Sequence, residues 1–267
     1  MAAARIVSLC PSITETLTGL GALPRLVGVT RYCVRPKGLL AGLVRVGGTK
    51  TPDLDRIVEL QPDLVLANEE ENRREDVLAL RARGIAVDVT FPRRVADVPA
   101  AVRHWGALLS PDTQVEAEAL AGRIEGELRS LEVEAAAPRF SYAYWIWKDP
   151  WMTVNDDTYV ADLLRLAGGA NVFGGNAARY PTVSPREALA RGAEVCFFAS
   201  EPFPFRPEKH QAQAERLFGR DRKLLFVDGD DYCWHGLRTL DGLKAVRGLR
   251  TIFGNLSTSQ NNKRKLG

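Results

Sequence analysis

Two series of short apolar runs, each alternating with helix-like segments, extend along most of the chain. In the first series, over residues 5–91, the apolar runs lie at 6–9, 26–29, 64–67 and 86–89. The second series begins after Pro138, with runs at 140–146, 195–199 and 224–227. Strands that alternate with helices at this spacing favour a largely parallel sheet covered on both faces. The pattern therefore predicts an α/β protein of two Rossmann-like lobes, each with a central, mostly parallel sheet.

A long polar segment separates the two series. Within residues 112–137 apolar side chains recur at helical spacing among charged ones, which predicts one helix of about seven turns. The apolar positions are Val115, Leu120, Ile124, Leu128 and Leu131. We therefore expect an N-terminal lobe over 1–110, a bridging helix over 111–137, a C-terminal lobe over 138–254 and a disordered tail over 255–267. Small ligands usually bind in clefts between domains, so an inter-lobe cleft is the expected site.

Capping patterns mark two helix starts. Ser12 is followed three residues later by Glu15, and Ser184 by Glu187, which is the capping-box spacing. The first of these helices follows the strand at 6–9, so its N-terminus is expected at the carboxyl edge of the sheet. Ligands of open α/β sheets bind at that edge.

Composition narrows the function classes. Of 267 residues, 45% are hydrophobic and 26% charged, as in ordinary globular proteins, and the net charge is only +3. Basic residues are interspersed with acidic ones, which argues against nucleic-acid binding. No apolar stretch is long enough to span a bilayer, and residues 1–5 lack the pattern of a secretory leader. As written, the chain is expected in the cytoplasm unless a leader has been removed.

The cysteines and the motif search predict no catalytic or metal centre. The four cysteines, Cys10, Cys33, Cys196 and Cys233, are widely spaced and include no CxxC pair, so we interpret them as free thiols. No GxSxG elbow, GxxxxGK[ST] phosphate loop, GxGxxG after a strand or HExxH motif is present. We therefore expect a protein that is not an enzyme and has no intrinsic cofactor.

The expected loops at the strand ends are rich in aromatic residues. They contain Tyr32, Phe91, Trp145, Trp147, Trp151, Phe203, Phe205, Tyr232 and Trp234. Aromatic side chains on the ligand side of both lobes would form a stacking surface for a large flat molecule. The alternative is that several of them only cap the sheets, and Trp145 is expected to face the core or a helix. His235, next to Trp234, is a candidate imidazole ligand, against the commoner structural role of a lone histidine.

Five segments carry a resemblance to a known family. They are 8–15, 28–33, 46–49, 62–67 and 200–205, with the sequences SLCPSITE, GVTRYC, VGGT, PDLVLA and SEPFPF. In their order and spacing over residues 5–253 the chain resembles the helical-backbone metal receptors. These are the substrate-binding proteins of ABC importers for cobalamin, haem and iron-siderophore chelates, and the resemblance is to the cobalamin-binding branch.

The resemblance implies two lobes joined by one long rigid helix, a shallow cleft that closes only modestly, and no catalysis. It implies a monomer that binds a metal chelate, above all cobalamin, and delivers it to an importer permease. By position, the residues that would line the cleft are Pro11, Ser12, Arg31, Tyr32, Trp147, Trp151, Arg179, Phe203, Trp234 and His235. A corrinoid or porphyrin would offer flat faces to the aromatic residues and peripheral carboxylates or amides to the two arginines.

The resemblance also implies a docking surface and a location. Family members dock on the permease through one exposed glutamate on each lobe, which points to Glu75 in the first lobe and to Glu208 or Glu215 in the second. They carry an export signal or a lipid anchor, which implies the periplasm or the cell surface. This chain shows neither of these signals.

Two alternatives stay open at this point. The first is a haem or ferric-siderophore binding protein. Haem predicts an axial ligand such as His235 or Tyr32, and a siderophore predicts basic residues gathered in the cleft. The second is a cytoplasmic enzyme or sensor that keeps the fold, for which a thiol with a lowered pKa, such as Cys33, would be evidence.

Overall fold

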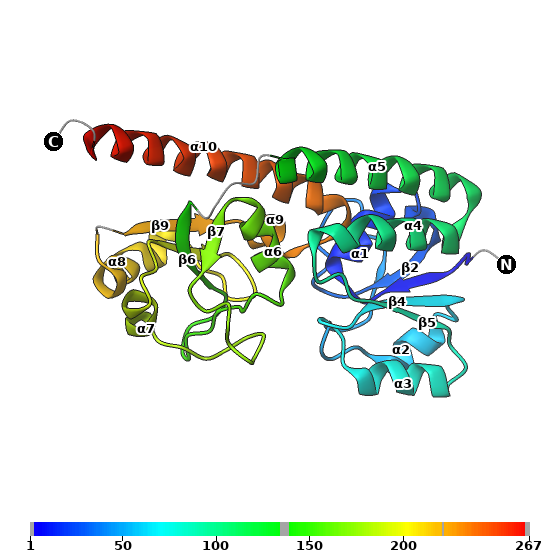
Figure 1. The fold of residues 1–267 in the computed structure, drawn as a ribbon. Helices are drawn as coiled ribbons and strands as arrows, with labels where there is room; N and C mark the ends of the chain where they lie inside the picture. The colour runs from blue at the N-terminus through cyan, green and yellow to red at the C-terminus, as the bar shows by residue number, and fades with distance from the viewer. Residues whose placement is uncertain (1–2, 134–138, 221, 265–267) are drawn as a thin grey trace. The chain divides into compact units, whose positions relative to one another are not determined.

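A computed structural model describes residues 3–133, 139–220 and 222–264 of the protein (Figure 1). The chain divides into two compact units, which are described separately. The first unit contains Met1–Pro92, Ala96–Gly126 and Trp234–Thr239. The second contains Arg93–Val95, Glu127–Cys233 and Leu240–Gly267. These boundaries differ from the expected ones, because six residues from far along the chain, 234–239, complete the first unit.

The first unit is built on a parallel five-stranded sheet. Its strands are β1 (Ile6–Ser8), β2 (Leu26–Val29), β3 (Val44–Arg45), β4 (Leu64–Asn68) and β5 (Val87–Thr90), in the order β3-β2-β1-β4-β5. Every neighbouring pair is parallel. The helices are α1 (Pro11–Gly19), α2 (Leu54–Glu59), α3 (Arg74–Ala82), α4 (Val98–Leu109) and part of α5 (Pro111–Val133), with short 3-10 turns η1 (Leu23–Arg25), η2 (Val95–Asp97, shared between the units) and η3 (Gly236–Arg238).

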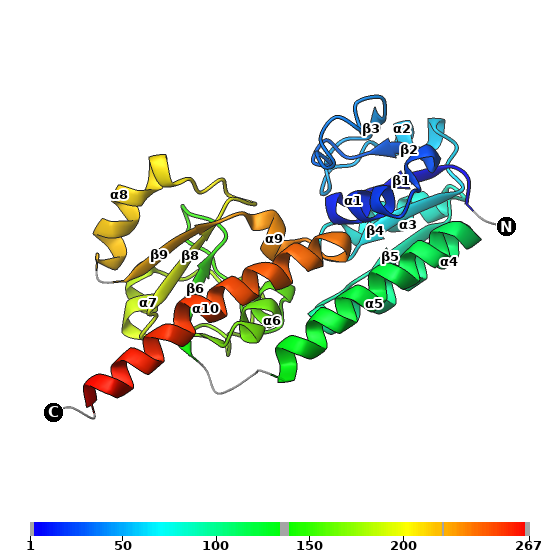
Figure 2. The same ribbon diagram turned by 90° about the horizontal axis from the view of Figure 1, so that it is seen from above.

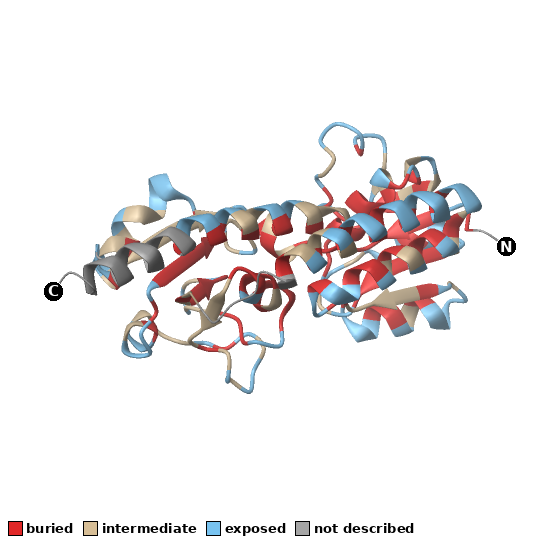
Figure 3. Ribbon diagram, turned by 45° about the horizontal axis from the view of Figure 1, so that its top comes forward, coloured by how far each residue is buried: buried red, intermediate tan, exposed pale blue. Residues whose placement is uncertain are grey.

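Successive side chains of each strand point to opposite faces of this sheet. Val7 and Val65 share a buried cluster with Ile57 of α2 and with Val77 and Leu80 of α3. In Figure 1, α2 and α3 accordingly lie on one side of the strands, and α1 and α4 lie on the other. β1 and β4 are buried along their whole length, which Figure 3 shows in red.

The second unit has a parallel four-stranded sheet. Its strands are β6 (Phe140–Trp145), β7 (Gly169–Asn171), β8 (Val195–Ala199) and β9 (Lys223–Val227), in the order β7-β6-β8-β9. The helices are α6 (Tyr159–Leu166), α7 (Pro185–Ala190), α8 (Pro207–Phe218), α9 (Gly229–Cys233) and α10 (Thr239–Arg264). Trp145 is fully buried in a cluster with Phe198 and with Phe218 of α8, as its place in the strand predicts.

The two sheets repeat one arrangement. The order β2-β1-β4-β5 in the first unit corresponds to β7-β6-β8-β9 in the second, and in each the connection between the third and fourth of these strands contains one helix, α3 or α8. The predicted α/β class, with parallel sheets in two units, is confirmed. β3 and β7 were not expected, because two or three residues at a sheet edge give too short a pattern to recognise.

Three local expectations are wrong. The N-cap of α1 is Cys10 rather than Ser12, because Pro11 occupies the first helical position. No side chain caps this helix. Val115 is 67% exposed, since five residues turn a helix by about 500° and so place it roughly 140° from Leu120, which is buried. The tail expected from residue 255 is helical through Arg264, because adding residues to a helix already formed costs little compared with nucleation.

Two other expectations involve residues that the structure does not describe. Residues 134–137 of the expected bridging helix and 265–267 of the expected tail lie outside the described residues.

The capping box at Ser184 and Glu187 is confirmed at the start of α7. Over the described part of the chain, no helix combines the length and the apolar character needed to cross a membrane.

Candidate functional site

The carboxyl edge of the first sheet is held together by a buried polar network around His235. The imidazole Nδ1 lies 2.9 Å from Ser12 Oγ in the first turn of α1, and Nε2 lies 3.0 Å from Asn68 Nδ2 at the end of β4. His235 is 6% exposed and Ser12 4% exposed. The imidazole is also 5.7 Å from the Trp105 ring, between ring centroids. Both ring nitrogens of His235 therefore have partners inside the protein.

The surrounding bonds determine which nitrogen of His235 carries the proton. Asn68 Oδ1 accepts from the backbone N–H groups of Glu70 and Glu71, so the amide nitrogen must face the imidazole and donate to Nε2. Nδ1 then carries the hydrogen and donates to Ser12 Oγ. Burial lowers the pKa of His235 to about 4, so the ring is neutral near pH 7.

Residues 234–239 attach to α1 through three further contacts. Gly236 has φ +84°, and a Cβ there would lie 2.0 Å from Thr16 Oγ1, so only glycine fits. The Leu237 N–H donates to the same hydroxyl at 3.0 Å. The Arg238 guanidinium donates to the carboxylate of Glu15, with the side chains only 15% and 7% exposed. Glu15, expected in a capping box, is thus the buried ion-pair partner of a residue more than 200 positions away.

The two cysteines near this edge are buried and hydrogen-bonded to neighbouring hydroxyl groups. Thr14 Oγ1 lies 3.1 Å from Cys33 Sγ, and Cys10 Sγ lies 3.2 Å from Ser12 Oγ. Burial raises the pKa of Cys10 to about 12 and also raises the pKa of Cys33. All four cysteines are free thiols, as expected. An enzyme or sensor would have been supported by a lowered pKa of the Cys33 thiol, whereas this pKa is raised.

Arg31 and Tyr32, after β2, are exposed side chains at the first edge. Tyr32 is 52% exposed, and the Arg31 guanidinium carbon lies 5.4 Å from the centre of its ring. Arg31 also reaches Thr51 Oγ1 at 3.4 Å. The two side chains lie against Gly48, where a Cβ would come within 2.9 Å of the guanidinium and 3.2 Å of the ring. The GGT turn in the sequence therefore leaves space for this cation–aromatic pair.

The carboxyl edge of the second sheet is aromatic. Trp147, 40% exposed, follows β6, and its ring lies 5.6 Å from Phe203, which follows β8. Phe203 in turn lies 4.6 Å from Phe205. Trp151 stacks on Phe205 at 5.8 Å and packs against the core of the unit. Trp147 is thus the exposed member of this cluster, Phe203 and Trp151 are half-buried against the core, and Phe205 is buried.

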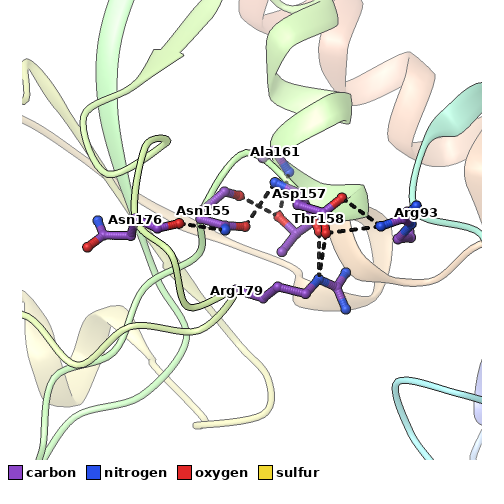
Figure 4. Close-up of polar contacts among 7 residues, drawn as sticks. All are labelled: Arg93, Asn155, Asp157, Thr158, Ala161, Asn176 and Arg179. Atoms are coloured by element: carbon purple, nitrogen blue, oxygen red, sulfur yellow. Dashed lines mark hydrogen bonds and ion pairs between the residues drawn. The ribbon is translucent and has the colours of Figure 1, made fainter.

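Arg179 belongs to a separate polar cluster of the second unit (Figure 4). Its Nε donates to the backbone carbonyl of Asp157 at 2.7 Å and lies 3.5 Å from a carboxylate oxygen of the same residue. Arg93 Nη1 donates to both carboxylate oxygens of Asp157, at 3.1 and 3.2 Å. The Asn155 side chain accepts from the Asp157 N–H. The Asp157 carboxylate thus lies between the guanidinium groups of Arg93 and Arg179.

The remaining predicted residues lie in different settings. Pro11 is buried as the first residue of α1, and Trp234 is 8% exposed. Glu75 and Glu208 are exposed, and each is the second residue of its helix, α3 and α8. A hollow of about 310 Å³ in the first unit is lined by Phe91, but by none of the predicted ligand residues. In the described part of the chain no three His, Cys, Asp or Glu side chains are grouped to hold a metal ion.

A family model described as periplasmic binding protein matches residues 6–222. The chain belongs to this family. Among curated members, the vitamin B12-binding protein of Vibrio cholerae serotype O1 is 28% identical over 248 residues, which cover 91% of this chain and 88% of the relative. The resemblance found in the sequence is therefore confirmed at the level of family.

Two solved structures show the same fold. The periplasmic vitamin B12 binding protein BtuF of Vibrio cholerae superposes with a TM-score of 0.79 at 24% identity, covering 94% of this chain and 98% of the other. The apo periplasmic heme-binding protein RhuT from Roseiflexus sp. RS-1 gives a TM-score of 0.78 at 21% identity, covering 94% and 99%. At these identities the similarity establishes the fold of this periplasmic binding protein and not its ligand.

Proposed function

We propose that this periplasmic binding protein is a non-catalytic receptor that binds a corrinoid and delivers it to an ABC importer. The observation that carries the proposal is the aromatic surface that the exposed Trp147 and the half-buried Phe203 form at the carboxyl edge of the second sheet. Large aromatic side chains left partly exposed at a ligand edge suit a ligand with extended apolar faces. The vitamin B12-binding relative, which matches along 91% of the chain, supports the same ligand class.

The ten candidate residues divide into ligand contacts and supports. We assign ligand contact to the exposed Arg31, Tyr32 and Trp147 and to two partly exposed side chains, Phe203 beside Trp147 and Arg179 in its separate polar cluster. Pro11, Ser12, Trp234 and His235 are buried, and the Trp151 ring packs on the buried rings of Trp145 and Phe218, so we assign these five residues a supporting role. The arginines would donate to amide or carboxylate groups on the ligand periphery while the rings contact its faces.

Haem is the second candidate, because a heme-binding protein has nearly the same fold similarity. His235 is poorly suited to be its axial ligand, since Nε2 accepts from Asn68 and Nδ1 donates to Ser12. Tyr32, which is 52% exposed, remains the candidate axial residue. An enzyme or sensor is supported by neither the cysteine pKa values nor the motif search.

Importer docking is assigned to Glu75 and Glu208. The two sheets repeat one arrangement, and in it α3 and α8 occupy corresponding places. Each glutamate is the exposed second residue of its helix, so the two residues correspond in the repeat. An acidic side chain on each unit suits a partner with a basic residue at two related positions. Delivery to an importer would place the protein in the periplasm or at the cell surface.

The test is a titration of the purified protein, stripped of ligand, with cyanocobalamin, haem and a ferric siderophore, followed by tryptophan fluorescence and the visible spectrum. Saturable quenching by cyanocobalamin at micromolar or lower concentration is the expected result. Saturation by haem alone would transfer the assignment to haem, and Tyr32→Phe would then alter its visible spectrum. No saturation by any of the three would overturn the proposal.

A further inference from the structure

One stretch of the first unit differs in charge from the rest of the chain. From Thr16 to Pro52 the sequence contains no Asp or Glu and six basic residues, which are Arg25, Arg31, Arg35, Lys37, Arg45 and Lys50. The whole protein has 36 basic and 33 acidic residues, so this stretch alone carries a formal charge twice the net charge of the chain. An anion or an anionic surface is the complementary partner.

Two apolar side chains stand out at the centre of this stretch. Val34 and Leu39 are each 56% exposed. They flank Lys37, which is also exposed. In Figure 2 the loop between β2 and β3, coloured blue, extends away from the strands of its unit. Side chains that are more than half exposed project from the surface instead of lining a groove, so they suit a partner into which they can insert.

Hydrogen bonds within the first unit already hold the backbone of the loop between β2 and β3 in one conformation. The Leu39 N–H donates to the Pro36 carbonyl, and Gly38 between them has φ +82°, as a type II turn requires at its third position. At the base of the loop, Arg45 donates to the carbonyls of Thr30 at 3.1 Å, Cys33 at 2.9 Å and Leu40 at 3.2 Å. Binding through the loop would therefore cost little conformational entropy.

We propose that residues 34–39 bind the surface of an anionic phospholipid bilayer. Val34 and Leu39 would enter the boundary between headgroups and acyl chains, and Lys37 would lie among the anionic headgroups, a combination typical of interfacial membrane contacts. The alternative partner, an acidic protein segment, would need a groove that matches the two projecting apolar side chains. A bilayer needs no such groove, because its surface deforms around them. The inference goes beyond ligand binding and does not depend on the identity of the ligand.

The test is co-sedimentation of the full protein with vesicles of phosphatidylglycerol and phosphatidylcholine, compared with vesicles of phosphatidylcholine alone. Binding is expected only to the anionic vesicles and should weaken with salt. The double variant Val34→Ser/Leu39→Ser should lower the partition coefficient by about tenfold or more. Lys37→Gln should lower it by about fivefold.

Matched controls distinguish vesicle binding through residues 34–39 from nonspecific binding through any exposed apolar side chain. Val115→Ser/Leu78→Ser removes the same two residue types at positions 67% and 51% exposed, and it should leave vesicle binding unchanged. A melting curve and a cyanocobalamin titration of each variant verify its fold and keep this test independent of the proposed function. Absence of vesicle binding, or equal loss in the control, would overturn the proposal. So would binding of an acidic amphipathic peptide by a protein that ignores the vesicles.

Discussion

The two sheet edges of this periplasmic binding protein share one topology and differ in chemistry. At the first edge, His235 and Ser12 are buried and hydrogen-bonded to each other. At the second edge, Trp147 and Phe203 pack edge to face and stay partly exposed. Buried polar groups stabilise a fold only when each has a partner, whereas exposed rings keep surface for a ligand. The comparison teaches that the buried side chains of the first edge stabilise its fold, whereas the partly exposed rings of the second edge keep surface that a ligand can contact.

The largest expected effect is at the first edge. Arg238→Ala leaves the buried carboxylate of Glu15 without its ion-pair partner, and it should lower the free energy of unfolding by about 3–5 kcal/mol. The matched control is Arg247→Ala, whose pair with Glu127 has side chains 41% and 46% exposed and should contribute under about 1 kcal/mol. Denaturant unfolding of both variants measures the difference, and equal losses would contradict the importance of burial.

Stability should also depend on pH through His235. Its pKa is about 4 in the folded protein and 6.5 as its ordinary value, so between these pH values the unfolded state binds the proton and the folded state does not. The free energy of unfolding should therefore fall by about 3 kcal/mol as the pH drops from 6.5 to 4, and this contribution should level off below pH 4. Denaturant unfolding of the wild type and of His235→Gln across this range isolates the histidine. Parallel curves would contradict the assignment.

The second edge should respond in affinity instead. Trp147→Ala removes a ring that is 40% exposed, and it should weaken cyanocobalamin binding on the order of tenfold. The melting temperature of this variant should hardly change, because Trp147 lies outside the buried core cluster that contains Trp145 and Phe198. Ile252→Ala, an apolar side chain 48% exposed on α10 of the same unit, is the control and should not alter the affinity.

The smallest expected effect concerns the space beside Arg31. Gly48→Ala puts a methyl group within 2.9 Å of the guanidinium and 3.2 Å of the Tyr32 ring, so both flexible side chains must shift. Cyanocobalamin affinity should fall about threefold, which corresponds to roughly 0.6 kcal/mol. Gly122→Ala in α5, where a Cβ meets nothing within 4 Å, should leave affinity intact and stabilise the helix by up to about 1 kcal/mol. The same titration and melting curve cover both variants.

The elements were predictable from the sequence because strand and helix periodicity is local. The runs at 26–29 and 195–199 coincide with β2 and β8, and Ser184 forms the expected capping box. The family was predictable as well, from the order of five short segments. These features depend on residues close together in the chain.

The roles of the site residues were not predictable in the same way. Ser12 and His235 are 223 positions apart, and no local pattern indicates that they meet. Asn68, which orients the imidazole, lies one residue beyond the predicted strand, and Arg238 has no sequence signal as the partner of Glu15. Exposure distinguishes Trp147 from Trp151, and exposure depends on packing across the whole unit. Only tertiary structure distinguishes buried from exposed side chains among such residues.

The central claim is that the buried polar network at the first edge stabilises the fold, whereas the exposed ring of Trp147 at the second edge contacts the ligand. It is tested most directly by the cyanocobalamin affinity of Ser12→Ala beside that of Trp147→Ala, each measured under conditions where melting curves show a folded protein. Ser12→Ala removes the acceptor of the His235 N–H and should cost about 1–3 kcal/mol of unfolding free energy. The account predicts wild-type affinity for Ser12→Ala and a loss on the order of tenfold for Trp147→Ala. A loss of affinity in folded Ser12→Ala, with Trp147→Ala unchanged, would contradict it.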